Sequence, residues 1–182
     1  THVIEGLWPR LQQGLCPKCA GQVGVSRRNG PAGSLTDVPG NNPRRIGVLG
    51  GTFDPPHNGH VLAGIEARDR LNLDLVLFTV ANDPWQKTGV GGLRESGLTG
   101  AELRLSMVEA AVEGHRGLQA DDLEMQRGGP TYTADTLIEL EGRYPGANLF
   151  VLIGSDVAST LDSWIRPDEV RQHATIVVMD RP

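Results

Sequence analysis

Four short, continuously apolar runs constrain the fold of this chain more than any other feature. They are residues 46–49, 75–80, 148–153 and 174–179, and a weaker run lies at 118–125. A strand with one face in water alternates apolar and polar side chains, whereas a strand covered on both faces is apolar throughout. The runs therefore predict the strands of a parallel sheet that has helices on both faces.

Helical patterns lie between these runs. Thr99 and Glu102 have the spacing of a capping box, and apolar residues including Val108 then follow at helical spacing. A second predicted helix has Thr133 as its cap, and a third apolar pattern of helical spacing ends at Trp164. Strands that alternate with helices predict a doubly wound α/β fold with a parallel sheet, in which ligands bind at the carboxyl ends of the strands.

Length, charge and hydropathy exclude several classes of protein. The 182 residues suffice for one domain, and the formal net charge of −5 shows no basic stripe of the kind that nucleic-acid binders carry. The sequence contains no run of roughly 18 apolar residues, so no membrane span is predicted, and the first residues do not resemble a secretion signal. We therefore expect a cytoplasmic protein with no nucleic-acid or membrane partner.

Residues 1–43 differ from the rest of the chain. They are rich in Gly, Pro, Asn, Ser and Arg and have no periodicity, which predicts a disordered leader ahead of one domain over 44–182. Cys16 and Cys19 form a CxxC pair, but no second ligand pair follows at the spacing of a zinc site. We interpret them as two unpaired thiols and expect no metal ligands in the protein.

The segment after the first run carries the clearest chemical signal. Residues 50–60 read Gly-Gly-Thr-Phe-Asp-Pro-Pro-His-Asn-Gly-His. The glycines let a ligand approach the backbone closely, and the N-terminus of the following helix suits a phosphate group. One histidine near a turn is usually only a surface group. His57 and His60 lie three residues apart at a helix entry and can direct both rings to one point, which predicts a phosphate-binding site.

This string resembles the signature of the HxGH nucleotidyltransferase superfamily and matches it without a gap. Three further segments resemble those of bacterial nicotinate-nucleotide adenylyltransferases, in the same order along the chain: Pro84-Trp85-Gln86-Lys87, the stretch Gly129-Pro130-Thr131-Tyr132-Thr133-Ala134-Asp135-Thr136-Leu137, and Gly154-Ser155-Asp156 with Leu161 and Trp164 downstream. The resemblance covers roughly residues 45–182 and implies a Rossmann-like nucleotidyltransferase fold.

The resemblance also implies a reaction and a site. The adenylyl group of ATP would pass to nicotinate mononucleotide, giving deamido-NAD and pyrophosphate in NAD biosynthesis, with Mg²⁺ accompanying ATP. Because the mononucleotide phosphate is already an anion, catalysis reduces to alignment and stabilisation of charge. The implied catalytic residues are His57, His60 and Lys87. The implied ATP site is formed by Gly50, Gly51, Thr52, Phe53, His57, His60, Gly154 and Asp156. The implied mononucleotide site is formed by Trp85, Thr131, Tyr132, Thr133, Trp164 and Ile165.

Some of these residues have a purely structural alternative. Lys87 is equally consistent with a solvated surface lysine. Trp164 either stacks on the pyridine ring or belongs to the core, since its spacing fits both, and Thr133 is also an ordinary helix cap. Arg104 and Arg127 are candidates for phosphate contacts, but we favour surface ion pairs for both.

The chain departs from the family pattern after its last apolar run. Relatives continue with a Ser-Thr-x-x-Arg motif that the resemblance assigns to ATP phosphates, whereas this sequence stops at Pro182. We therefore expect the domain to be incomplete at its C-terminus. Two alternatives stay open: a pantetheine-phosphate adenylyltransferase, and a nucleotide-binding remnant without catalytic activity. A homo-oligomeric assembly is also left open.

Overall fold

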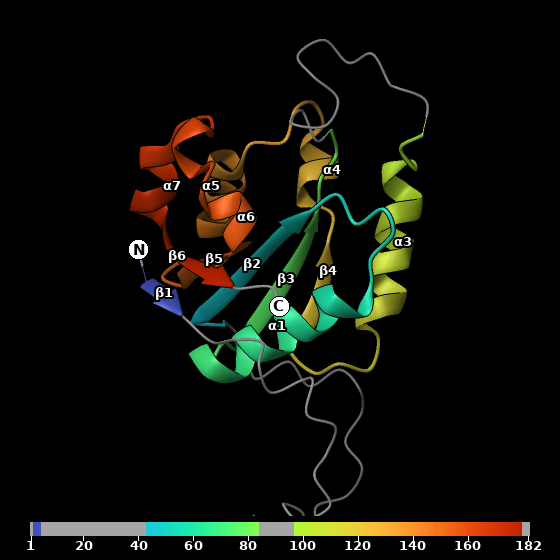
Figure 1. The fold of residues 1–182 in the computed structure, drawn as a ribbon, viewed down its shortest axis with the longest axis horizontal. Coiled ribbons are helices and arrows are strands. Elements are labelled where there is room, and N and C mark those ends of the chain that lie inside the picture. Colours follow the sequence, from blue (N-terminus) through green and yellow to red (C-terminus); the bar gives the residue numbers. More distant parts are fainter. Residues whose placement is uncertain (1, 5–42, 84–96, 180–182) are drawn as a thin grey trace, which may run out of the picture.

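A parallel sheet forms the centre of the molecule (Figure 1). The computed structural model describes residues 2–4, 43–83 and 97–179. Within these ranges six strands pair in the order β1-β6-β5-β2-β3-β4, and every pairing is parallel. The strands are β1 (His2–Ile4), β2 (Arg45–Gly51), β3 (Leu75–Val80), β4 (Leu118–Asp121), β5 (Asn148–Gly154) and β6 (Ala174–Met179). The predicted sheet is confirmed.

Helices cover both faces of this sheet, as the continuously apolar strands require (Figure 1). Those of the described ranges are α1 (Asn58–Leu71), α3 (Ala101–Val112), α4 (Leu123–Arg127), α5 (Thr133–Arg143), α6 (Ser155–Ala158), the 3₁₀ helix η1 (Leu161–Ser163) and α7 (Pro167–His173). Side chains of α1 and α3 join the core on one face, and those of α4, α5 and α7 join the core on the other. None of these helices is long and apolar enough to span a bilayer.

Strand β3 shows how the two cores form. All six of its residues are buried. Val76 and Phe78 face the side of α1 and α3, while Leu75 and Leu77 face the side of α5. Burial of each such side chain contributes about 1.5–3 kcal/mol relative to exposure. Helix α1 comes close enough to this strand that a Cβ atom on Gly64 would lie 2.7 Å from the Phe78 ring.

The order of the strands creates one switch point in the sheet, where a crevice for ligands is expected. From β2 the chain steps outward to β3 and then to β4, and afterwards it crosses to β5 on the other side of β2 and continues to β6. The direction of winding therefore reverses between β2 and β5. In open α/β sheets, ligands bind at such a switch point, beyond the carboxyl ends of the strands.

Local structure differs from the predictions at several element ends. The expected strand over 118–125 ends at Asp121, because an Asp121 carboxylate oxygen accepts the Leu123 N–H at 3.0 Å and α4 begins there. Thr99 does not cap α3: Gly100 holds that position, and the Thr99 N–H donates to the Asp54 carboxylate at 2.8 Å. The prediction of a Thr99 capping box was wrong.

Two further corrections concern Thr133 and the third apolar pattern. Thr133 is the first residue of α5, and Tyr132 holds the cap position. The pattern that ends at Trp164 is not one helix but is divided between α6 and η1. Residues 2–4 of the expected leader form β1, which extends the sheet along the edge of β6. The other leader residues, Cys16 and Cys19 among them, lie outside the described ranges.

Candidate active site

The loops that follow β2 and β5 flank the crevice at the switch point. Strand β2 ends at Gly51 and its loop leads to α1, while β5 ends at Gly154 and leads directly into α6. Asp156 lies in α6 and is exposed. The expected ATP-binding residues that follow β2 and β5 are thus brought to the same edge of the sheet.

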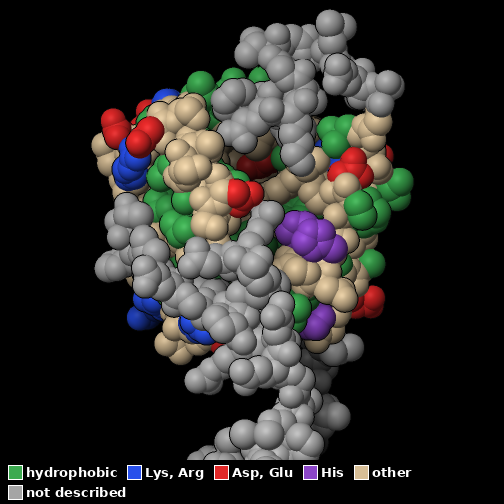
Figure 2. All heavy atoms as spheres, viewed as in Figure 1, with side chains coloured by type: hydrophobic (Ala, Val, Ile, Leu, Met, Phe, Trp, Pro, Cys, Tyr) green, Lys and Arg blue, Asp and Glu red, His purple; other side chains and the backbone are tan. Residues whose placement is uncertain are grey.

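The two histidines form a stacked pair at the start of α1. Their ring centroids lie 3.8 Å apart with an interplanar angle of 26°. The His57 N–H donates to Nδ1 of His60 at 3.2 Å, and the His60 N–H donates to the His57 carbonyl at 2.9 Å. Because Nδ1 of His60 is an acceptor, its neutral ring carries the proton on Nε2, which makes that atom a donor. Figure 2 shows histidine side chains gathered beside a hollow in this face.

Phe53 packs against His60 of this pair. Its side chain is buried, and its ring contacts His60 edge-to-face at 5.1 Å between centroids. Phe53 has a positive φ of 51°, an uncommon conformation for a residue with a side chain. A Cβ atom on Gly51 would lie 3.0 Å from the Phe53 ring, so the glycine leaves room for the ring. The loop therefore holds His60 against a fixed aromatic surface.

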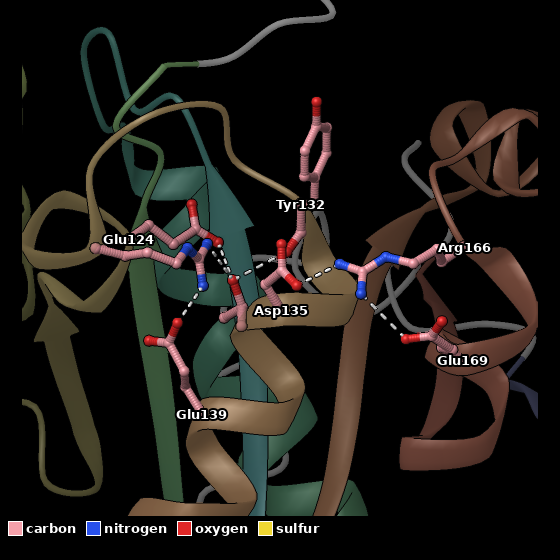
Figure 3. A network of polar contacts seen from close by, with 8 residues as sticks. Glu124, Tyr132, Asp135, Glu139, Arg166 and Glu169 are labelled. Carbon is pink, nitrogen blue, oxygen red and sulfur yellow. Dashed lines mark hydrogen bonds and ion pairs between the residues drawn. The ribbon is translucent and has the colours of Figure 1, made fainter.

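The loop before α5 carries three of the expected mononucleotide contacts. The Thr131 N–H donates to the Asp83 carbonyl at 3.2 Å, and the Thr131 hydroxyl accepts the Asn82 N–H at 3.1 Å. This loop is thereby tied to the end of β3. Thr131, Tyr132 and Thr133 are all half-buried, and in Figure 3 the Tyr132 ring points away from the polar network below it.

That network includes Glu124 of α4 (Figure 3). Glu124 is 4% exposed, and one of its carboxylate oxygens accepts the Thr136 hydroxyl at 2.7 Å. Its other oxygen, Oε2, is buried and forms no hydrogen bond within the described residues. Burial raises the pKa of Glu124 to about 7, against the lowering effects of Thr136, Arg127 and Thr131. Sequence reasoning missed this residue because it placed 118–125 in a strand.

The structure confirms the sequence-based interpretation of one arginine and contradicts that of another. Arg127 donates to the Glu139 carboxylate at 3.0 Å, which confirms the ion pair expected for it. Arg104 is 1% exposed, so the surface ion pair expected there was wrong. Its spacing of four residues from Val108 and eight from Val112 was the available signal, since these three side chains share the buried face of α3.

The segment after η1 brings Trp164 and Ile165 toward α5. Trp164 is half-buried and packs against the core on the α5 side, and its indole N–H is buried without a hydrogen-bond partner among the described residues. Ile165 is 43% exposed. The next residue, Arg166, has a left-handed backbone and pairs with Asp135 of α5 (Figure 3). This pair ties the Trp164 segment to the helix that follows Tyr132.

Two of the predicted site residues fall outside the part of the chain that the structure describes. Trp85 and Lys87 lie outside the described residues. Within the described ranges, no three His, Cys, Asp or Glu side chains converge to hold a metal ion. The site as described therefore consists of the histidine pair, the strand-end loops around the crevice, and the Thr131–Thr133 and Trp164 segments.

A parallel sheet whose switch point carries a histidine pair at a helix N-terminus is suited to bind a ligand that contains a phosphate group. A family model described as cytidylyltransferase-like matches residues 48–182. The chain therefore belongs to the cytidylyltransferase-like family.

Within this family the chain is similar to proteins named "Probable nicotinate-nucleotide adenylyltransferase". The protein of Corynebacterium kroppenstedtii is 40% identical over 76% of this chain and 63% of its own length. That of Oceanobacillus iheyensis is 39% identical over 76% of this chain and 69% of its own length. The chain spans 63% of the length of the relatives from Corynebacterium kroppenstedtii and Saccharopolyspora erythraea.

Solved structures agree on the fold. The nicotinic acid mononucleotide adenylyltransferase of Plasmodium falciparum complexed with NaAD has a TM-score of 0.63 at 17% identity, covering 76% of this chain and 65% of that one. At this level of identity the likeness concerns the fold alone.

Proposed function

We propose that this protein transfers the adenylyl group of ATP to nicotinate mononucleotide, giving deamido-NAD and pyrophosphate in NAD biosynthesis. The observation that carries the proposal is the stacked His57–His60 pair at the N-terminus of α1, at the switch point between β2 and β5. The names of the similar proteins from Corynebacterium kroppenstedtii and Oceanobacillus iheyensis support the choice of reaction.

The reaction does not require a covalent nucleophile from the protein. An oxygen of the mononucleotide phosphate forms a bond to the α-phosphorus of ATP, while the bond to the β-phosphate breaks and pyrophosphate leaves with the electron pair. Negative charge spreads over the transferring group in the transition state. His57, His60 through Nε2, and the N-terminal end of α1, whose first turn contains no acidic residue, would stabilise that charge. Gly50, Gly51, Thr52 and Phe53 would shape the ATP side of the crevice, with Gly154 and Asp156 opposite.

The second substrate would occupy the α5 side. The segment Thr131–Thr133 would contact the mononucleotide, and the ring of Trp164 would stack on the pyridine ring. The half-buried state of Trp164 leaves part of its surface for a ligand while the rest packs on the core. The backbone N–H of Ile165 would help to hold the nicotinate carboxylate. On the resemblance of their segment, we assign Trp85 to the mononucleotide and Lys87 to stabilisation of charge in the transition state.

A divalent cation belongs to this reaction, since nucleotidyltransferases of the family generally use one with ATP. The described residues do not fit a dedicated metal cage, because no three potential ligands converge there. Magnesium ions are commonly held by substrate phosphates and water. We propose that Mg²⁺ would accompany ATP and would neutralise charge on the departing pyrophosphate, without a dedicated cage among the described residues.

The test of this function is His60→Ala with His115→Ala as a matched control. His115 is an exposed histidine between α3 and β4, away from the strand ends that form the site. Loss of one preorganised donor should lower kcat for pyrophosphate release by about 10²–10³ and leave the Kd for nicotinate mononucleotide nearly unchanged. His115→Ala should behave like the wild type. A fall in kcat of less than about tenfold for His60→Ala would contradict the assigned role.

A further inference from the structure

Arg104 is an internal cation that the reaction as proposed does not use. Its side chain is 1% exposed and lies on the face of α3 that also buries Val108 and Val112. Burial lowers the pKa of Arg104, and the Asp54 carboxylate partly offsets this effect. Removing a guanidinium from water is strongly unfavourable unless its N–H groups find good acceptors. The placement of those acceptors therefore indicates what the residue does.

The acceptors are three backbone carbonyls from three separate segments. Nε of Arg104 donates to Thr99 at 2.8 Å, Nη1 donates to Thr52 at 2.7 Å, and Nη2 donates to Asn82 at 3.3 Å. Thr52 lies directly after β2, in the loop that leads to the histidine pair. Asn82 follows the end of β3, and Thr99 precedes α3. One side chain thus joins the loops at the carboxyl ends of two neighbouring strands.

Asn82 extends this connection to the loop before α5. Its backbone N–H donates to the Thr131 hydroxyl at 3.1 Å, and its side-chain Nδ2 donates to the Gly129 carbonyl at 3.0 Å. On the other side, the Thr99 N–H donates to the Asp54 carboxylate at 2.8 Å, in the histidine loop. A continuous path of hydrogen bonds therefore runs from the histidine loop through Arg104 to the Thr131 loop.

We propose that Arg104 is a positioning residue that fixes the loop of His57 and His60 relative to the loop of Thr131 and Tyr132. This inference rests on the proposed function, in which ATP lies against the first loop and the mononucleotide against the second. Each loop can bind its own substrate, but the reacting atoms meet only when the two loops keep their relative placement. Misplacement of reacting groups by about 1 Å can reduce a rate about 10²-fold.

An arginine suits this task better than a lysine. The guanidinium is planar and directs five donors along fixed lines, so it can hold three carbonyls at set positions. A lysine ammonium is a compact point charge on a flexible stem. Arg104→Lys therefore keeps the charge and removes the geometry, which makes it the informative substitution.

The matched control is Arg45→Lys. Arg45 also donates to a backbone carbonyl through two nitrogens, to Leu71 at 3.1 and 2.9 Å, and stacks over the Phe150 ring. It lies at the first residue of β2, at the opposite end of the sheet from the site. We expect Arg104→Lys to lower kcat about 10- to 100-fold, with the separate Kd values for ATP and for nicotinate mononucleotide changed by less than about threefold. Arg45→Lys should change none of these quantities.

An unchanged kcat in Arg104→Lys would overturn the proposal, as would a parallel loss of affinity for both substrates. If this variant does not fold, Asn82→Ala weakens the second half of the path, because it removes the bond to Gly129 and leaves Arg104 and the backbone bond to Thr131 in place. A kcat about three- to tenfold lower is then expected, with both Kd values retained. An Asn82→Ala enzyme with wild-type kcat would contradict the path.

Amide hydrogen exchange in the substrate-free protein gives a readout that does not depend on catalysis. Arg104→Lys should accelerate exchange at the Thr99 and Thr131 N–H groups, which are bonded to Asp54 and Asp83, by about tenfold or more, because their local opening becomes easier. Arg45→Lys should not. Equal exchange in both variants would refute the positioning role. If the wild-type protein shows no adenylyl-transfer activity, the proposed function is refuted instead. The exchange measurement would still test the positioning role of Arg104.

Discussion

The Glu124 carboxyl should make the stability of this protein depend on pH in an unusual direction. Its pKa is about 7 in the folded state against an ordinary value of 4.5, chiefly because burial disfavours the charged form. The nearby Asp121 carboxylate acts in the same direction, while Thr136, Arg127 and Thr131 oppose it. The folded protein therefore holds this proton more tightly than the unfolded chain. The stabilisation is complete below pH 4.5 and is lost as pH rises through about 7.

The size of the effect follows from the two pKa values. Between about pH 5 and about pH 8 this group alone should remove about 2.5 kcal/mol from the free energy of unfolding. Glu124→Gln keeps the size of the side chain and an acceptor for the Thr136 hydroxyl but cannot ionise. Urea unfolding of wild type and variant at both pH values measures the difference. Relative to wild type, the variant should gain about 2.5 kcal/mol on going from the lower to the higher pH.

Glu139→Gln is the control for this measurement. Glu139 belongs to the same network through Arg127, but its side chain is 39% exposed. The corresponding difference for Glu139→Gln should stay within about 0.5 kcal/mol across the same range, as is usual for exposed positions. A stability difference between Glu124→Gln and wild type that does not change with pH would refute the reasoning, because it would mean that the carboxyl titrates alike in both states.

Substitutions at Trp164 and at Gly51 test the site further. Trp164→Ala should raise the KM for nicotinate mononucleotide roughly three- to tenfold and leave the KM for ATP unchanged, if stacking is worth about 0.5–1.5 kcal/mol. Trp164→Phe keeps a ring and serves as the comparison. Equal effects of Trp164→Ala on both substrates, with a large loss of stability, would assign Trp164 to the core. Gly51→Ala should reduce the free energy of unfolding by about 1–3 kcal/mol, because its Cβ would lie 3.0 Å from the Phe53 ring. Gly50→Ala, whose Cβ would meet nothing within 4 Å, should be near neutral in the same unfolding experiment, and equal losses in the two variants would contradict the role of the Phe53 contact.

Much of the architecture could be predicted because it depends on local pattern. A strand that is buried on both faces must be apolar throughout, so the runs at 75–80 and 148–153 indicated strands that are covered on both faces. The string over residues 50–60 likewise placed two histidines at a helix entry by spacing alone, and the structure stacks their rings. The ends of elements were less predictable. Thr99 had the sequence of a cap, but the distant Asp54 carboxylate took its N–H and the helix began after Gly100.

The sequence by itself determined five of the six described strands, their alternation with helices and the residues that carry the family signature. Only the tertiary structure decided which polar groups are buried and what they bind. Arg104 is an ordinary helical arginine in sequence, and its acceptors lie 5, 22 and 52 residues away. Glu124 obtains its raised pKa from burial under α5, whose Thr136 lies 12 residues further on. Local pattern depends on neighbours along the chain, whereas desolvation and hydrogen-bond geometry depend on which distant segments the sheet and its helices bring together.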